Sequence, residues 1–197
     1  MGVALIILAV TVAVSLAGLY GSPGIIQRSL FRPYWFLRRR QYETIVTSGF
    51  VHADLSHLLF NAFTFFFFAF QVERQIGSAR FAALYLFGLV ASNVGTYFKH
   101  RDNPDYASLG ASGAISAVLF ASIVYFPWQK LIIFPIPIPI PAPLFAIGYV
   151  VYSWYSAGHA RGRINHDAHL GGALAGLAFV LVTDPGAYAN LLGAVSG

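Results

Sequence analysis

The sequence predicts an all-α membrane protein, a bundle of six transmembrane helices with an interfacial insertion between the first two. Hydrophobic residues make up 57% of the 197 residues and charged residues only 10%, and the mean hydropathy is +0.67. These values lie outside the range of soluble domains. Short segments that hold nearly every charge separate six apolar runs of helical length, at residues 3–20, 55–72, 81–98, 107–128, 143–157 and 169–183. Because the runs use almost the whole chain, we expect residues 1–197 to form one domain, with any chemistry inside the bundle.

The segments between the runs indicate a lipid bilayer, rather than nucleic acid, as the partner. No basic residue precedes the first run, which is therefore expected to be a retained helix and not a signal peptide. Segment 21–54 is basic and aromatic, and we expect it to fold at the level of the lipid headgroups. Residues 134–143 alternate proline with apolar residues, which predicts an extended, polyproline-like connection without sheet hydrogen bonds.

Two polar residues stand at the start of apolar runs, Ser112 in the fourth and His169 in the sixth. Polar and ionisable groups in lipid-spanning segments are costly and suggest a functional site. A neutral histidine can take the proton of a serine hydroxyl that acts as a nucleophile. Both runs follow odd-numbered connections, so the two side chains are expected near the same membrane face.

Small residues follow this serine and this histidine at helical spacing. Gly113 and Ala117 are four residues apart, as are Gly172 and Gly176. Residues at this spacing lie on one face of a helix, where small side chains let two backbones approach closely. Ordinary helix packing explains one such pair; the polar residues beside both pairs favour a catalytic arrangement.

The second run supplies candidate donors for an oxyanion. His57 and Asn61 are four residues apart and share a helix face, at the same end as Ser112. Both side chains can donate a hydrogen bond to a developing negative charge, as can the backbone N–H of Ser112. A single asparagine in a membrane helix more often bonds a neighbouring helix. Its pairing with His57 favours the oxyanion role.

Other hydrolytic chemistries fit the chain less well. There is no His-Glu-x-x-His motif and no cysteine, and the aspartates fall at run ends or in connections. His166 and His169 have no carboxylate or thiolate partner in a run, so we expect no metal and no cofactor. Ala114 stands where an α/β-hydrolase elbow requires glycine. Because Asp167 is only two residues from His169, a Ser-His dyad is the simpler reading.

Nine polar or small residues near the second, fourth and sixth runs carry a resemblance to a known family: His52, His57, Asn61, Gly110, Ser112, Gly113, His169, Gly172 and Gly176. In this order they resemble the rhomboid intramembrane serine proteases, a six-helix family. The resemblance implies that Ser112 is the nucleophile and His169 the general base. It further implies that His57 and Asn61 stabilise the oxyanion, while His52 and the glycines support the site. Ser116, which is not part of the family pattern, is also expected to support it.

The chain departs from the family pattern four residues after the nucleophile. Family members often carry an aromatic residue there, which packs on the catalytic histidine, whereas this chain has Ser116. We therefore expect a hydrogen bond rather than ring stacking to orient His169. Glu73-Arg74-x-x-Gly77 also resembles the family and is expected to form a structural loop.

The membrane orientation gives two opposed expectations. The first, third and fifth connections hold most of the lysines and arginines, which places that side in the cytoplasm by the positive-inside rule. The resemblance implies instead that the active site at this end opens to the outer face. We follow the resemblance, because the arginines cluster in a segment that need not behave as a plain loop.

The expected function is cleavage of a peptide bond in or beside a transmembrane helix of a membrane-protein substrate, through an acyl-enzyme on Ser112. The protein is expected to be multi-pass, in a bacterial-type plasma membrane. One alternative is an inactive rhomboid-like protein that binds transmembrane helices; retention of both Ser112 and His169 argues against it. Another is a small transporter or channel, which the grouping of polar residues at one face disfavours.

Overall fold

The computed structural model describes residues 2–133, 136–159 and 165–196, and most of these residues are helical. The longer helices are α1 (Val3–Leu16, continued by a π-helical turn at Ala17–Gly21), α5 (Leu55–Ile76), α6 (Ser78–His100), α7 (Ser112–Tyr125), α8 (Ala142–His159), α9 (His166–Thr183) and α10 (Ala187–Ser196). The short elements are α2 (Pro23–Ser29), α3 (Pro33–Arg38), α4 (Thr44–Thr47), a 3-10 turn (Ser48–Phe50) and the strands β1 (Lys130–Ile133) and β2 (Ile136–Pro141).

The outer surface of the bundle is apolar. Within the described residues, four helices are long and apolar enough to cross a membrane: Val3–Gly21, Leu55–Ile76, Ser78–His100 and His166–Thr183. Along α5, Phe60, Phe63, Phe66 and Phe67 each leave more than half of their surface exposed. A contiguous apolar surface of this kind is stable against lipid rather than water. The chain is therefore an integral membrane protein.

The central helix of the bundle is α7. Every residue from Gly113 to Tyr125 is buried, and α5, α6 and α9 pack around it. Its backbone touches that of α9 directly, because a Cβ atom on Gly172 would overlap the carbonyl oxygen of Gly113. One turn further, a Cβ atom on Gly176 would overlap the carbonyl oxygen of Ala117. The predicted small residues on both helices thus form the contact between them.

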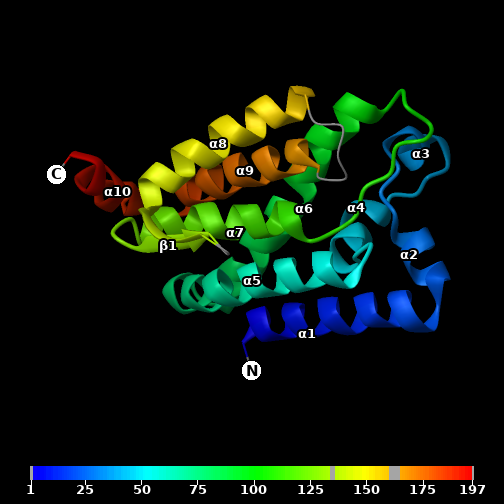
Figure 1. The fold of residues 1–197 in the computed structure, drawn as a ribbon, viewed down its shortest axis with the longest axis horizontal. Coiled ribbons are helices and arrows are strands. Elements are labelled where there is room, and N and C mark those ends of the chain that lie inside the picture. Colours follow the sequence, from blue (N-terminus) through cyan, green and yellow to red (C-terminus); the bar gives the residue numbers. More distant parts are fainter. Residues whose placement is uncertain (1, 134–135, 160–164, 197) are drawn as a thin grey trace.

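The first and third connections meet at one end of the bundle, on the right in Figure 1. Phe31 and Ser108 exchange backbone hydrogen bonds of 3.0 and 2.9 Å as an isolated β-bridge. At the same end Lys99, on the last turn of α6, forms an ion pair of 2.8 Å with Asp167 at the start of α9. The connection between α1 and α5, which contains α2, α3 and α4, therefore lies at the end where α7 and α9 begin.

Helices α7 and α9 begin at positions that the apolar runs did not predict, and α6 likewise begins at Ser78, three residues before its run. Helix α9 starts at His166, so His169 is its fourth residue and not its first. Asn165 caps this helix, because its side-chain oxygen accepts a hydrogen bond of 3.1 Å from the Ala168 N–H. Helix α7 starts at Ser112, five residues after the predicted run, since Gly110 has a φ of 113° that no α-helix contains.

The expected loop around Glu73 is instead the last turn of α5. The Glu73 carboxylate accepts hydrogen bonds from the N–H groups of Val3 (2.6 Å) and Ala4 (3.2 Å) and from Ser78 Oγ (2.6 Å). A carboxylate at a helix N-terminus satisfies N–H groups that have no partner within the helix and interacts favourably with the helix dipole. Glu73 therefore joins the start of α1 to the junction of α5 and α6.

The proline-rich connection was expected to be free of sheet pairing, and this prediction was wrong for its described part. Strand β2 pairs antiparallel with β1, with Ile140 opposite Leu131 and Pro139 opposite Ile132. Residue pairs in an antiparallel ladder alternate between hydrogen-bonded and non-hydrogen-bonded positions. Prolines spaced two apart can all occupy the positions that need no N–H donor, and a two-stranded sheet offers only edge strands. Residues 134 and 135 of this segment lie outside the described residues.

The contact between α7 and α9 predicts that replacing glycine by alanine lowers the stability of the protein at Gly172 but not at Gly95. Alanine normally stabilises a helix by about 1 kcal/mol relative to glycine. Gly172→Ala should nevertheless lower the thermal unfolding midpoint in detergent, because the added methyl group meets the backbone of Gly113, and overpacking costs about 1–3 kcal/mol. Gly95→Ala in α6 is the matched control, since nothing lies within 4 Å of the added Cβ. A Gly172→Ala protein that melts at or above the wild-type temperature would contradict this account.

Candidate active site

Ser112 is the first residue of α7, and the chain before it is fixed by the backbone. Gly110 donates a hydrogen bond of 2.9 Å from its N–H to the Ser48 carbonyl oxygen. A Cβ atom on Gly110 would lie 2.7 Å from Cε1 of His57, so the loop passes directly against that ring. Both this close approach and the positive φ require glycine at position 110. The half-buried Ser112 thus follows a turn with little freedom to move.

His52 holds the residue that precedes Ser112. The fully buried ring accepts a hydrogen bond at Nε2 from the Ala111 N–H, with 3.4 Å between the nitrogens. Its Nδ1 lies 2.9 Å from Oγ of Ser15, and that hydroxyl donates to the Phe50 carbonyl oxygen at 3.1 Å. Because Nε2 is the acceptor, Nδ1 carries the proton and donates to Ser15. This chain of hydrogen bonds connects α1, the loop before α5 and the loop before α7.

The start of α5 positions His57 beside the same loop. Asp54 caps the helix, with Oδ1 accepting from the His57 N–H at 2.8 Å. The rings of His52 and His57 are 4.9 Å apart between centroids, edge to face. Asn61 is buried one turn later, and its Nδ2 donates to the His57 carbonyl oxygen at 2.9 Å. An amide group has a second N–H, which this bond leaves available to another acceptor.

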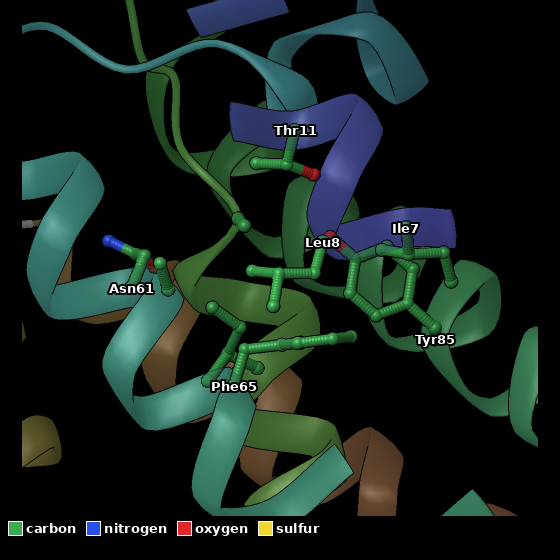
Figure 2. A pocket seen from close by; sticks show the side chains of 9 residues that line it. Ile7, Leu8, Thr11, Asn61, Phe65 and Tyr85 are labelled. Atoms are coloured by element: carbon green, nitrogen blue, oxygen red, sulfur yellow. The ribbon is translucent and has the colours of Figure 1, made fainter. Parts of the chain in front are cut away.

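Asn61 also borders a narrow cavity between α1, α5, α6 and α7. Figure 2 shows it on α5, with Thr11 and Leu8 reaching in from α1 and Tyr85 from α6. The cavity is lined mainly by apolar side chains: Ile7, Leu8, Thr11, Asn61, Ala62, Phe65, Tyr85, Ala111 and Ile115. This lining contains neither Ser112 nor His169, so the cavity lies beside the candidate site and not at its centre.

A second hollow, more polar, does include the candidate nucleophile. Its walls come from the 3-10 turn, α6, the loop before α7 and the start of α9: Ser48, Leu89, Ser92, Asn93, Ser108, Leu109, Gly110, Ser112, Gly113, Asn165 and Ala168. Ser112 and the neighbour of His169, Ala168, thus face the same small space. Several hydroxyl and amide groups converge there, which is the environment that holds buried water in proteins.

His169 lies in the second turn of α9, and Asn165 fixes the start of that helix. The Asn165 Nδ2 donates to Oγ1 of Thr96 at 3.0 Å, which joins α9 to α6. The ring of His166 approaches that of His169 edge to face, with centroids 6.0 Å apart. Further along α9, Gly172 contacts the backbone of Gly113, the residue after Ser112.

The expected hydrogen bond from Ser116 reaches a different residue from His169. Oγ of Ser116 lies 2.8 Å from the hydroxyl oxygen of Tyr149 on α8. The ring of Tyr149 in turn lies 6.4 Å from that of His169, with 19° between the ring planes. An aromatic ring therefore does face the histidine, and it comes from another helix than the sequence comparison suggested.

Three residues of this arrangement were missed at the level of sequence. Ser15 was a polar residue inside the first apolar run, and Asn165 was a helix-capping type just before the sixth; both signals could have been used. Tyr149 gave no signal, because it is twenty residues from His169 in an ordinary apolar run. Among the described residues, no three His, Asp or Glu side chains gather as a metal site would require.

Comparison with known proteins places most of the chain in a known family. Residues 39–185 match the family model described as Rhomboid domain. The rhomboid protein YdcA of Bacillus subtilis (strain 168) is 42% identical over 75 residues, which cover 38% of this chain and 37% of that protein. The human presenilin-associated rhomboid-like protein, mitochondrial, is 33% identical over 69% of this chain and 36% of its own length. Rhomboid protein 1, mitochondrial, of Saccharomyces cerevisiae is 28% identical over 76% of this chain and 45% of its own length.

The chain thus matches less than half the length of each of these relatives. The family match itself covers well over half of this chain and includes every residue of the candidate site except Ser15. The chain therefore belongs to the rhomboid family.

Proposed function

We propose that this protein is an intramembrane serine endopeptidase that cleaves transmembrane-helix substrates with a Ser112–His169 dyad. The observation that carries the proposal is the backbone contact between α7 and α9. It joins Gly113, the residue after the nucleophile, to Gly172, three residues after the base. A rigid contact so close to both side chains keeps their relative position constant, as proton transfer between them requires.

In the proposed reaction, His169 removes the proton from Ser112 Oγ as the oxygen attacks the scissile carbonyl carbon. The peptide C–N bond then breaks, His169 returns the proton to the leaving amine, and water hydrolyses the acyl-enzyme on Ser112. The oxyanion of each tetrahedral intermediate would accept hydrogen bonds from the Ser112 N–H, His57 and Asn61. The first N–H groups of a helix have no partner within it, which suits the Ser112 N–H to this role.

The His52 network supports the proposal because it fixes the backbone beside that N–H. Burial lowers the pKa of His52 to about 3, since the charged ring would lose its solvation by water. At neutral pH the ring is therefore uncharged, and Nε2 stays available as an acceptor for the Ala111 N–H. The donor that follows, Ser112 N–H, then keeps its direction while charge develops on the substrate.

The length of α7 supports catalysis below the membrane surface. Its 14 residues span about 21 Å, whereas the hydrocarbon layer is about 30 Å thick. A helix this short, at the centre of longer ones, would begin within the bilayer, and the polar hollow beside Ser112 could admit water there. We propose that α1, α5, α6, α7, α8 and α9 are the six spans of one domain over residues 1–197. Helices α2, α3 and α4 would form the interfacial insertion.

Substrates are proposed to be membrane proteins whose helix unwinds near the cleavage site, because a scissile bond must leave its helical hydrogen bonding before Ser112 can attack. No metal or cofactor enters this mechanism. The location in a bacterial-type plasma membrane stays a prediction, as does the opening of the site to the outer face.

Replacing either dyad residue should abolish cleavage. Ser112→Ala and His169→Ala are each expected to lower the rate on a reporter transmembrane substrate by at least about 1,000-fold, because the two groups act as a unit. Fluorophosphonate labelling of Ser112 should disappear in both variants. The matched control is Ser122→Ala on the same helix, whose buried hydroxyl bonds only one turn back to the Leu119 carbonyl oxygen, at 2.7 Å. If Ser112→Ala cuts the substrate as fast as wild type, or if the wild-type protein binds substrates without labelling or cleavage, the proposed function is wrong.

Removing the His52 acceptor should slow the reaction without touching the dyad. His52→Ala leaves the Ala111 N–H buried without its partner, at a cost of about 1–3 kcal/mol. We expect a lower thermal midpoint and a labelling rate at Ser112 reduced by about 10-fold or more. Ser15→Ala, which leaves the acceptor in place, should have a smaller effect in the same direction. Wild-type labelling and stability in His52→Ala would show that the network does not hold the loop.

A further inference from the structure

We propose that Tyr149 is a positioning residue for His169, and that Ser116 holds Tyr149 in place. The inference rests on the proposed function and adds to it the group that sets the orientation of the base. It joins three helices, since Ser116 belongs to α7, Tyr149 to α8 and His169 to α9.

The hydroxyl groups of Ser116 and Tyr149 form a hydrogen bond with each other. Ser116 is buried, on a helix whose neighbours from Gly113 onward are all buried, and its Oγ lies 2.8 Å from the Tyr149 hydroxyl oxygen. A hydroxyl in apolar surroundings costs free energy unless it has a hydrogen-bond partner. Each of these groups gives the other that partner, so the bond fixes the outer end of the Tyr149 side chain.

Packing against two phenylalanine rings fixes the ring plane of Tyr149. Phe120, one turn after Ser116 on α7, lies 5.4 Å from it between centroids, and Phe145, one turn earlier on α8, lies 5.7 Å from it. Aromatic rings at these separations attract one another in defined geometries. With its hydroxyl bonded and its ring packed on both helices, Tyr149 is a rigid surface.

The ring of Tyr149 lies alongside the ring of His169. The two rings are nearly parallel, with 19° between their planes and 6.4 Å between their centroids. Rotation of a histidine ring about its last torsion angle meets no strong intrinsic barrier. A fixed ring that lies alongside therefore restricts this rotation and limits the directions in which a ring nitrogen can point.

The position of Ser116 on α7 also favours a role in catalysis. Ser116 is four residues after Ser112, so the two serines lie on one face of α7, one turn apart. The Ser116–Tyr149 hydrogen bond therefore couples the orientation of His169 to α7, the helix that carries Ser112. Tyr149 itself needs no contact with the substrate, and its effect would pass through the histidine.

The experiment compares four variants by the second-order rate of fluorophosphonate labelling at Ser112, by kcat and KM on a reporter transmembrane substrate, and by thermal midpoint. Tyr149→Leu removes the ring and should lower labelling and kcat by about 10- to 100-fold with KM unchanged, as for a misplaced catalytic group. Tyr149→Phe keeps the ring and should recover most of this loss. Tyr149→Phe and Ser116→Ala should each cost about 2- to 10-fold, the range for one hydrogen bond between neutral groups. The double variant, with Tyr149→Phe and Ser116→Ala together, should be no slower than either single variant, because both substitutions remove the same hydrogen bond.

Trp154→Leu is the matched control on α8, since this side chain is 71% exposed, and it should label at the wild-type rate. Wild-type labelling in a folded Tyr149→Leu protein would overturn the inference. If Tyr149→Leu does not fold, wild-type labelling in both Tyr149→Phe and Ser116→Ala would overturn it equally. Losses that add in the double variant would refute the role given to Ser116. A wild-type protein that neither labels nor cleaves would instead refute the proposed function, which keeps the two failures distinct.

Discussion

The backbones of α7 and α9 touch, and the positions of both proposed reacting groups depend on that contact. Gly172 and Gly176 have no side chain between the two helices, so the carbonyl oxygens of Gly113 and Ala117 occupy the space that a Cβ atom would take. Membrane helices gain little from the hydrophobic effect once inside lipid, and close packing of this kind is a main source of their association. The first pair of the contact, Gly172 on Gly113, lies within three residues of His169 and of Ser112. The same residues therefore contribute the packing energy and the geometry that we propose for catalysis.

Around this contact, hydrogen bonds between polar side chains join elements that are distant in sequence. His52 connects Ser15 to the loop before α7, Asn165 connects α9 to α6, and Ser116 connects α7 to α8. In a low-dielectric interior such bonds are stronger than in water, and an unpaired polar group is more costly. Each bond thus restricts one piece of the candidate site: the backbone before Ser112, the start of the helix that carries His169, and the ring beside His169.

The connection between α1 and α5 stabilises the same end of the bundle. Its bridge from Phe31 to Ser108 holds the loop that leads to Ser112, and Trp35 Nε1 donates to the Pro104 carbonyl oxygen at 3.3 Å. The guanidinium group of Arg39 lies 3.8 Å from the Trp35 ring centroid, as a cation–π contact. Basic and aromatic groups combined in this way suit the headgroup region of a membrane. Five of the charges that gave an ambiguous orientation, Arg28, Arg32, Arg38, Arg39 and Arg40, thus belong to a folded element that is hydrogen-bonded to the loop before Ser112.

The sequence alone predicts the membrane class, the approximate helix positions and the small residues between α7 and α9, because hydropathy and helical spacing are local properties. The family was recognisable from the order of the histidines, Asn61, Ser112 and the glycines. The starts of α7 and α9 were misplaced because one glycine dihedral and one asparagine cap, and not hydropathy, determine them. Strand β2 was missed because its pairing depends on a partner strand. Only the tertiary structure brings Tyr149 beside His169 and Ser15 beside His52, since contacts between distant helices depend on how their faces pack, which no local pattern in the chain records.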